Sequence, residues 1–224
     1  MAFLLVFIPV FAFADDVSNA SSVSDVSDVS SQAVVSDTSE PETEPVITSG
    51  NAIVVMSVET GQILLNTANG REVDPTCATK LMTAMLAFDM ANGLDNQVTV
   101  DAEALKNIGK KGDISAPMLG LRAGNTATVR QLLQATLISA ANDACNALAY
   151  SVSGGDIAGF VEKMNARATE IGCEHTYFTN TTGLYDGEAY TTVEDVAKIA
   201  AAFYRYNTLL DISSQPTYVI GGST

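Results

Sequence analysis

The chain has few basic residues and a single histidine. Its 224 residues include 11 Lys and Arg against 26 Asp and Glu, which gives a formal net charge of -15. This acidic balance argues against nucleic acid as a partner, because phosphate backbones bind positive surfaces. His175, the only histidine, forms with Cys173 a Cys-x-His pair that lacks a second pair of metal ligands at a recognisable spacing. We therefore expect neither a metal nor a cofactor.

Cysteine is also scarce, with one residue at each of positions 77, 145 and 173. An odd number excludes a complete disulfide framework and leaves at least one free thiol. A bridge between Cys145 and Cys173 stays open, although the small apolar neighbours of Cys145 favour packing in a core. No local signature of the known cysteine proteases surrounds Cys77, so a Cys–His hydrolase using His175 is a weak alternative.

The N-terminus has neither a basic start nor an apolar run of the length that a membrane helix needs. Residues 1–14 are almost wholly apolar and end in Ala-Phe-Ala, which is typical of a secretory signal and its cleavage site. A membrane-spanning helix needs about 20 apolar residues. Export is thus favoured over a buried strand or a short membrane anchor. We expect the mature protein at the extracellular or periplasmic face of the cell envelope.

Residues 15–49 contain no lysine or arginine and are rich in Ser, Asp, Val, Glu and Pro. Such a segment cannot bury enough apolar surface to offset the entropy of ordering it. It is predicted to be a disordered acidic linker between the signal and a folded domain at residues 50–224.

The folded domain is predicted to mix strands and helices. Residues 52–66 contain two β-rich runs around a Gly-containing turn, as in a hairpin. Residues 81–90 are apolar nearly all round, which indicates a helix buried on every side. Thr191 to Glu194 has the pattern of a capping box that opens a helix through about Tyr206. Further helices are expected at residues 129–138, 144–152 and 156–171, and a strand from Pro216 to Ile220. The fold class is α+β.

The candidate catalytic pair is Cys77 and Lys80, at the start of the apolar helix. Residues three apart share one helix face, so the sulfur and the amine can act as a nucleophile and a base. A helix N-terminus beside an ammonium also favours a thiolate, which would make them an ion pair instead. The spacing resembles the Ser-x-x-Lys element of penicillin-binding proteins and class A β-lactamases, with cysteine in place of serine.

Three further segments follow in the same order as in one family. They are Ala140 to Ala144 after the helix from Thr126, His175 to Leu184, and Thr191 to Asp195. Together with Cys77 to Lys80 they resemble the D-alanyl-D-alanine carboxypeptidase family over most of residues 51–220. The resemblance implies an antiparallel sheet with packed helices, a helical subdomain, and an active site between them. It also implies removal of the terminal D-Ala from peptidoglycan stem peptides through an acyl-enzyme, with β-lactam antibiotics as covalent ligands.

The resemblance assigns roles residue by residue. Cys77 would be the nucleophile, Lys80 the base, and Asn142 would orient the substrate amide. Asn142 also suits the N-cap of the following helix. Ala140 occupies the substrate-side position of the family's second serine, so the hydroxyl that relays a proton is absent. Ser139 is one residue out of place, and its side chain should point elsewhere.

The third family element, Lys-Thr-Gly on a late strand, does not occur before the chain ends at Thr224. The domain is therefore expected to lack the late strands of the sheet. Loss of an oxyanion donor costs roughly 10²- to 10³-fold in rate, and loss of a general acid or base about 10²- to 10⁴-fold. A catalytically silent domain that binds wall peptides or a partner, and a gene fragment that does not fold alone, stay open beside an active hydrolase. The sequence does not indicate an oligomeric state.

Overall fold

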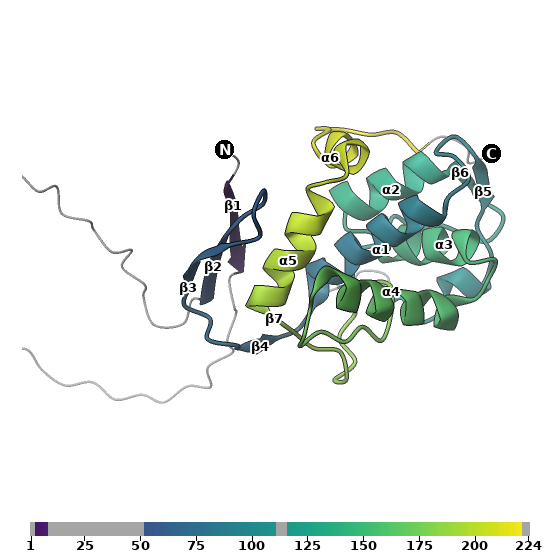
Figure 1. The fold of residues 1–224 in the computed structure, drawn as a ribbon. Helices are drawn as coiled ribbons and strands as arrows, with labels where there is room; N and C mark the ends of the chain where they lie inside the picture. Colours follow the sequence, from purple (N-terminus) through teal and green to yellow (C-terminus); the bar gives the residue numbers. More distant parts are fainter. Residues whose placement is uncertain (1–2, 9–51, 111–115, 221–224) are drawn as a thin grey trace, which may run out of the picture. The chain divides into compact units, whose positions relative to one another are not determined.

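The structure, a computed structural model, describes residues 3–8, 52–110 and 116–220 (Figure 1). The predicted acidic linker lies outside these residues. Of the segment assigned to an export signal, Phe3–Ile8 is described and forms strand β1. A strand was one of the alternatives for this segment, and export remains a prediction.

The expected hairpin is confirmed as β2 (Ala52–Ser57) and β3 (Ile63–Asn66). Both neighbours of β2 are antiparallel to it, with β1 paired from Phe3 opposite Ser57 to Ile8 opposite Ala52, so the order is β1-β2-β3. The buried side chains of β2 pack against one face of α5 (Val193–Phe203). Figure 1 shows the hairpin beside this helix. This contact joins the sheet to the helical part.

Helix α1 (Thr76–Met90) lies at the centre of the helical part. Met82, Ala84 and Met85 on it are at most 1% exposed. Its neighbours are α2 (Val129–Ile138), α3 (Asn142–Val152), α4 (Ile157–Ile171) and α5. Because the helix touches a neighbour on each side, its near-uniform apolar sequence is explained by burial.

Short elements connect these helices. Strand β4 (Glu72–Val73) pairs with β7 (Thr191–Thr192), and β5 (Gln97–Thr99) pairs with β6 (Thr126–Thr128), each antiparallel. A 3-10 turn, η1, spans Glu103–Leu105, and α6 spans Asn207–Ser213. Helices and small antiparallel sheets together confirm the α+β class.

Local signals for α4 hold, whereas two other predictions are wrong. Asp156 caps α4 by accepting a hydrogen bond from the Gly159 amide at 2.9 Å, and Gly172 ends it in the left-handed conformation. The N-cap of α5 is Thr192, one residue later than predicted, and the helix ends at Phe203 before α6 starts. Residues 216–220 form no strand, because the segment passes over α2, where Gln131 binds the Val219 carbonyl at 3.1 Å.

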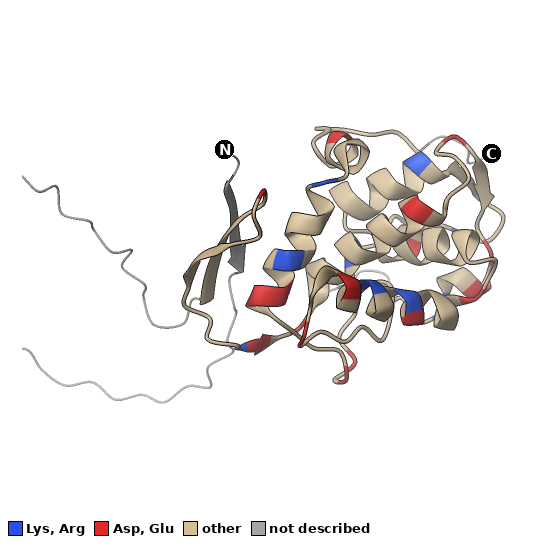
Figure 2. Ribbon diagram, viewed as in Figure 1, with Lys and Arg blue, Asp and Glu red and all other residues tan. Residues whose placement is uncertain are grey.

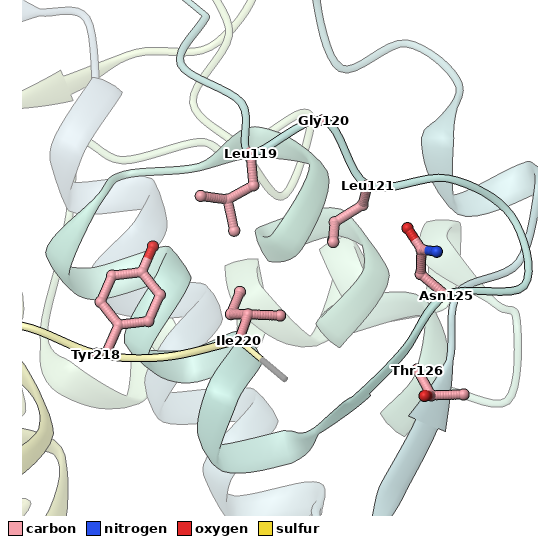
Figure 3. A pocket seen from close by; sticks show the side chains of 7 residues that line it. All are labelled: Leu119, Gly120, Leu121, Asn125, Thr126, Tyr218 and Ile220. Atoms are coloured by element: carbon pink, nitrogen blue, oxygen red, sulfur yellow. The ribbon is translucent and has the colours of Figure 1, made fainter. Parts of the chain in front are cut away.

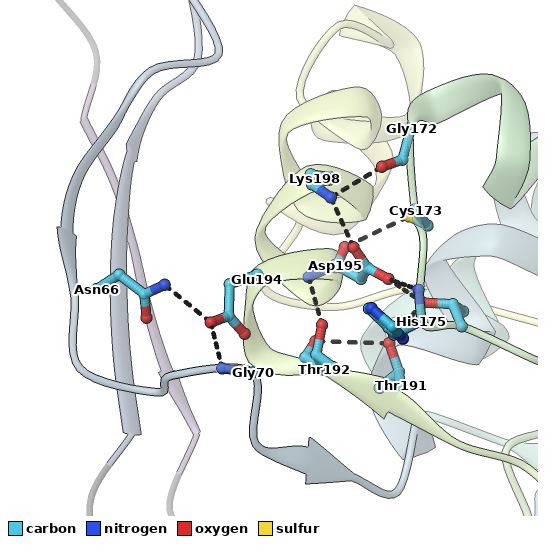
Figure 4. Close-up of polar contacts among 11 residues, drawn as sticks. Asn66, Gly70, Gly172, Cys173, His175, Thr191, Thr192, Glu194, Asp195 and Lys198 are labelled. Carbon is cyan, nitrogen blue, oxygen red and sulfur yellow. Dashed lines mark hydrogen bonds and ion pairs between the residues drawn. The ribbon is translucent and has the colours of Figure 1, made fainter.

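Glu194 does not form the predicted capping box, because its carboxylate binds the end of β3 and the turn after it (Figure 4). Its Oε1 accepts hydrogen bonds from the Asn66 side chain and the Gly70 amide, both at 2.8 Å. These partners are more than 120 residues away in sequence, so the local pattern could not reveal them.

Asp195, the next residue, holds the loop that follows α4 (Figure 4). Its carboxylate accepts from the His175 amide at 2.8 Å, the Thr176 hydroxyl at 2.9 Å and Lys198 at 2.8 Å. Burial opposes ionisation, but these bonds outweigh it and lower the pKa of Asp195. Figure 2 shows that basic and acidic residues are interspersed along α4 and α5.

Candidate active site

Cys77 lies exposed in the first turn of α1. The helix has no side-chain cap at Pro75, and Asp74 accepts the Thr76 amide at 3.0 Å. Within the described ranges, the amides of Cys77 and Ala78 have no acceptor. The partial positive charge of the helix N-terminus therefore lies beside the sulfur.

Lys80 is half-buried and donates a hydrogen bond to the Thr182 carbonyl. Burial lowers the pKa of its amine, while the nearby thiols of Cys145 and Cys77 act in the opposite direction. The structure thus brings Cys77 and Lys80 close enough to interact electrostatically, as their spacing predicts. An amine with a lowered pKa is neutral over a wider pH range and can accept a proton.

The acceptor of Lys80 belongs to a tight loop built by Asn180. Asn180 Oδ1 accepts from the amide and hydroxyl of Thr182, both at 3.1 Å, and from the Gly183 amide at 2.8 Å. Its Nδ2 donates to the Leu184 carbonyl at 2.9 Å. One asparagine therefore holds the turn that presents the carbonyl to Lys80.

The preceding carbonyl fastens the same loop to α1 and α3. Thr181 O accepts from the Thr83 hydroxyl at 2.8 Å and from the Cys145 thiol at 3.0 Å, and the Thr181 hydroxyl donates to Asn146 at 2.7 Å. Cys145 is fully buried, and burial raises the pKa of its thiol to about 11. This thiol is therefore a structural donor, in agreement with its predicted place in the core.

Gly183 allows this loop to approach the start of α1. Its φ is +72°, and a Cβ there would lie 2.2 Å from the Thr76 carbonyl oxygen. Backbone therefore packs on backbone next to Cys77. The left-handed conformation would strain any residue with a Cβ, and the close approach leaves no room for one.

The segment between α2 and α3 carries the other predicted residues. Ala140 is exposed with φ +51°, and it offers no hydroxyl. The Ser139 hydroxyl pairs with the Tyr218 hydroxyl at 2.6 Å, so it does point elsewhere. A left-handed conformation at a non-glycine residue is uncommon and costs about 1–2 kcal/mol of strain, so Ala140 is a strained position in the turn before α3.

Asn142 is only 1% exposed. Its Nδ2 donates to the Ile108 carbonyl at 3.0 Å, and its Oδ1 has no partner among the described residues. It is the first residue of α3 and not its cap, which is Ala141. Its predicted role toward a substrate amide stays a prediction, with Oδ1 as the one polar atom left for it.

Asp143 has a role that the sequence reasoning missed. Its carboxylate, 1% exposed, accepts the three successive amides of residues 119–121 at 3.1, 2.7 and 2.8 Å. The Asn142 amide donates to the Pro117 carbonyl at 2.7 Å. Residues 117–121 are thus tied to the first turn of α3. The available signal was an acid next to Asn142 at the start of a helix.

The loop held by Asp143 also lines a pocket of about 370 Å³. In Figure 3, Leu119 and Leu121 face Ile220 across it, with Tyr218 at one end and Asn125 and Thr126 at the other. The Tyr218 hydroxyl connects this pocket to the turn at Ser139. A hollow lined by both apolar and polar side chains therefore adjoins the turn that contains Ala140.

All three cysteines are free in the structure. Cys145 is fully buried and Cys173 is 8% exposed, and burial raises the pKa of the Cys173 thiol to about 12. The alternative of a Cys145–Cys173 bridge is not realised. Cys77 is thus the one cysteine whose thiol is exposed.

The geometry can be compared with known proteins. The model of the family described as D-alanyl-D-alanine carboxypeptidase matches residues 37–219. The chain is 29% identical to D-alanyl-D-alanine carboxypeptidase DacF of Bacillus subtilis over 156 residues, which is 70% of the chain and 39% of that relative. It is also 29% identical to DacB2 of Mycobacterium tuberculosis over 166 residues, covering 73% of the chain and 54% of DacB2.

A solved structure has a similar fold. Penicillin-binding protein 6B from Escherichia coli superposes with a TM-score of 0.67 and 27% identity, over 76% of this chain and 55% of that one. The chain spans about half the length of such relatives or less.

Proposed function

Because the chain belongs to the D-alanyl-D-alanine carboxypeptidase family, we propose that it removes the terminal D-Ala from peptidoglycan stem peptides through an acyl-enzyme on Cys77. The observation that carries this proposal is the exposed thiol at an open helix N-terminus beside a lysine of lowered pKa. Covalent catalysis needs an activated nucleophile, a proton acceptor and oxyanion donors. Each has a candidate here.

Acylation begins when the neutral amine of Lys80 takes the Cys77 proton. The sulfur attacks the carbonyl of the penultimate D-Ala, and negative charge develops on the carbonyl oxygen. The free amides of Cys77 and Ala78 are the nearest donors for this charge. The peptide C–N bond then breaks, the terminal D-Ala leaves with the proton, and a thioester remains on Cys77.

Deacylation returns the enzyme to its starting state. Water loses a proton to Lys80 and attacks the thioester carbonyl, which releases the shortened peptide as a carboxylate and regenerates the thiol. In the acylation step, Ala140 supplies no hydroxyl to pass a proton to the leaving amine of D-Ala, so Lys80 must deliver this proton directly. We expect turnover to be slow for this reason.

The alanine at 140 and the buried amide of Asn142 favour a second candidate function. A domain that binds stem peptides without completing turnover would need a peptide-binding surface but not the hydroxyl that relays a proton. It would still be acylated by a β-lactam if Cys77 and Lys80 work as a pair.

A penicillin tests the acyl-enzyme directly. After incubation with benzylpenicillin, intact-mass measurement should show one adduct per chain, and peptide mapping should place it on Cys77. A Cys77→Ala variant and a chain alkylated at its exposed thiol should both stay unmodified, while Cys173→Ala should react like the parent. An unmodified Cys77 peptide at high dose would refute the proposal.

We also propose that residues 1–14 direct export, because stem peptides lie outside the cytoplasm. In the part of the chain that the structure describes, no helix has the length and apolarity to span a bilayer. N-terminal sequencing of the protein expressed with residues 1–14 in a bacterial host should find cleavage after Ala14. A product that retains Phe3 to Ile8 would contradict export by cleavage and support the strand.

A further inference from the structure

The loop that binds Lys80 also lines a second hollow, to which neither Cys77 nor Lys80 contributes. It has a volume of about 430 Å³, within the range of small-ligand sites. Residues 179–182 form one wall. The other walls come from η1 and the residues after it, from α3, and from the start of α4: Glu103, Lys106, Asn107, Asn146, Tyr150, Gly155 and Ile157.

The lining of this hollow is polar but balanced in charge. Its charged residues, Glu103 and Lys106, pair with each other at 2.7 Å. The remaining polar groups are amides and hydroxyls, in a chain whose net charge is -15. An ionic ligand would find no uncompensated partner, whereas a neutral ligand rich in hydroxyl and amide groups would find many.

Some lining groups are fixed and others are open. Asn146 donates to the Ala104 carbonyl at 2.8 Å and accepts from Thr181, and Asn180 holds its own loop, so these walls are rigid. The side chain of Asn107 and the hydroxyl of Tyr150 have no hydrogen-bond partner among the described residues. They are the groups available to a ligand.

Glycine at 155 shapes the aromatic end of the hollow. Its φ is +94°, and a Cβ there would come within 3.2 Å of Cζ and Oη of Tyr150. The phenol therefore packs against bare backbone, with an apolar ring and a polar tip at one place. A sugar ring has matching properties, since it presents C–H groups on its faces and hydroxyls at its edge.

We propose that this hollow binds an N-acetylhexosamine disaccharide of the glycan strand whose stem peptide reacts at Cys77. The choice of glycan rests on the proposed function. Peptide and glycan are covalently joined in the wall polymer, and residues 179–182 border both sites. The acetamido groups would meet Asn107, and a ring face or hydroxyl would meet Tyr150.

The test uses the full chain, labelled with ¹⁵N, and N,N'-diacetylchitobiose as the probe. Amide shifts should change for Asn107, Tyr150 and residues 179–182. Tyr150→Ala should weaken binding about tenfold, the equivalent of one hydrogen bond with its packing. Tyr204→Ala, a tyrosine 41% exposed at the end of α5, should leave affinity unchanged.

Asn107→Gly keeps the test decisive if Tyr150→Ala fails to fold. Asn107 has φ +56°, which glycine adopts without strain, so this variant removes the amide at little cost in stability. It should weaken binding severalfold. The proposal would be overturned if both variants bound the sugar with wild-type affinity, or if the shifts were confined to other residues. Stronger shifts with inorganic phosphate than with the sugar would also overturn it. Sugar binding without a penicillin adduct would refute only the proposed function, and an adduct without sugar binding would refute only this inference.

Discussion

Replacement of Lys80 by methionine should slow β-lactam acylation of Cys77 about 10²- to 10⁴-fold, the usual contribution of a positioned general base. Methionine keeps most of the side-chain volume but cannot accept a proton or bind the Thr182 carbonyl. Rates of adduct formation measured by mass spectrometry would give this ratio. Lys198→Met is the matched control, because Lys198 also donates to a backbone carbonyl, Gly172 O at 2.8 Å, but lies on α5.

The pH dependence sharpens this prediction. Because burial lowers the pKa of Lys80 below the ordinary 10.5, acylation should rise with pH and level off below that value. The unfolded chain binds more protons than the folded chain between the two pKa values, so folding stability should also rise with pH across that window. Lys80→Met should lose this contribution to both profiles. Wild-type acylation rates in Lys80→Met would rule out Lys80 as the base.

Gly183→Ala should destabilise the folded chain by at least about 3 kcal/mol. A left-handed φ at a residue with a Cβ costs roughly 1–2 kcal/mol. The remainder comes from the Thr76 carbonyl, 2.2 Å from the added atom, which belongs to backbone and can move only if the first turn of α1 moves. Urea unfolding monitored by circular dichroism would measure the loss.

Gly187→Ala separates the two causes. Its φ of +84° is close to that of Gly183, but the nearest atom to an added Cβ is the Tyr185 hydroxyl oxygen at 3.9 Å. This variant should therefore cost only the conformational term, about 1–2 kcal/mol. Equal losses in the two variants would show that the loop does not press on the start of α1 as described.

The helices and the hairpin could be predicted because their causes are local. Apolar periodicity, Asp156 before α4 and Gly172 after it all act within a few residues. The α5 boundary was missed by one residue because Glu194 is bound to Asn66 and Gly70, far away in sequence, and Thr192 instead of Thr191 caps the helix. Competition from a tertiary partner is invisible to a local pattern.

The same division holds for the candidate site. The sequence alone determined that a thiol and an amine share one face of a helix start, since an i, i+3 spacing depends only on helix geometry. Tertiary structure decided what surrounds them. The acceptor of Lys80 lies 102 residues away, the amides held by Asp143 lie 22 to 24 residues away, and the carbonyl that accepts from the Asn142 side chain lies 34 residues away. Such pairings depend on how separate segments pack, and packing lowered the pKa of Lys80 and left the helix N-terminus open at Cys77.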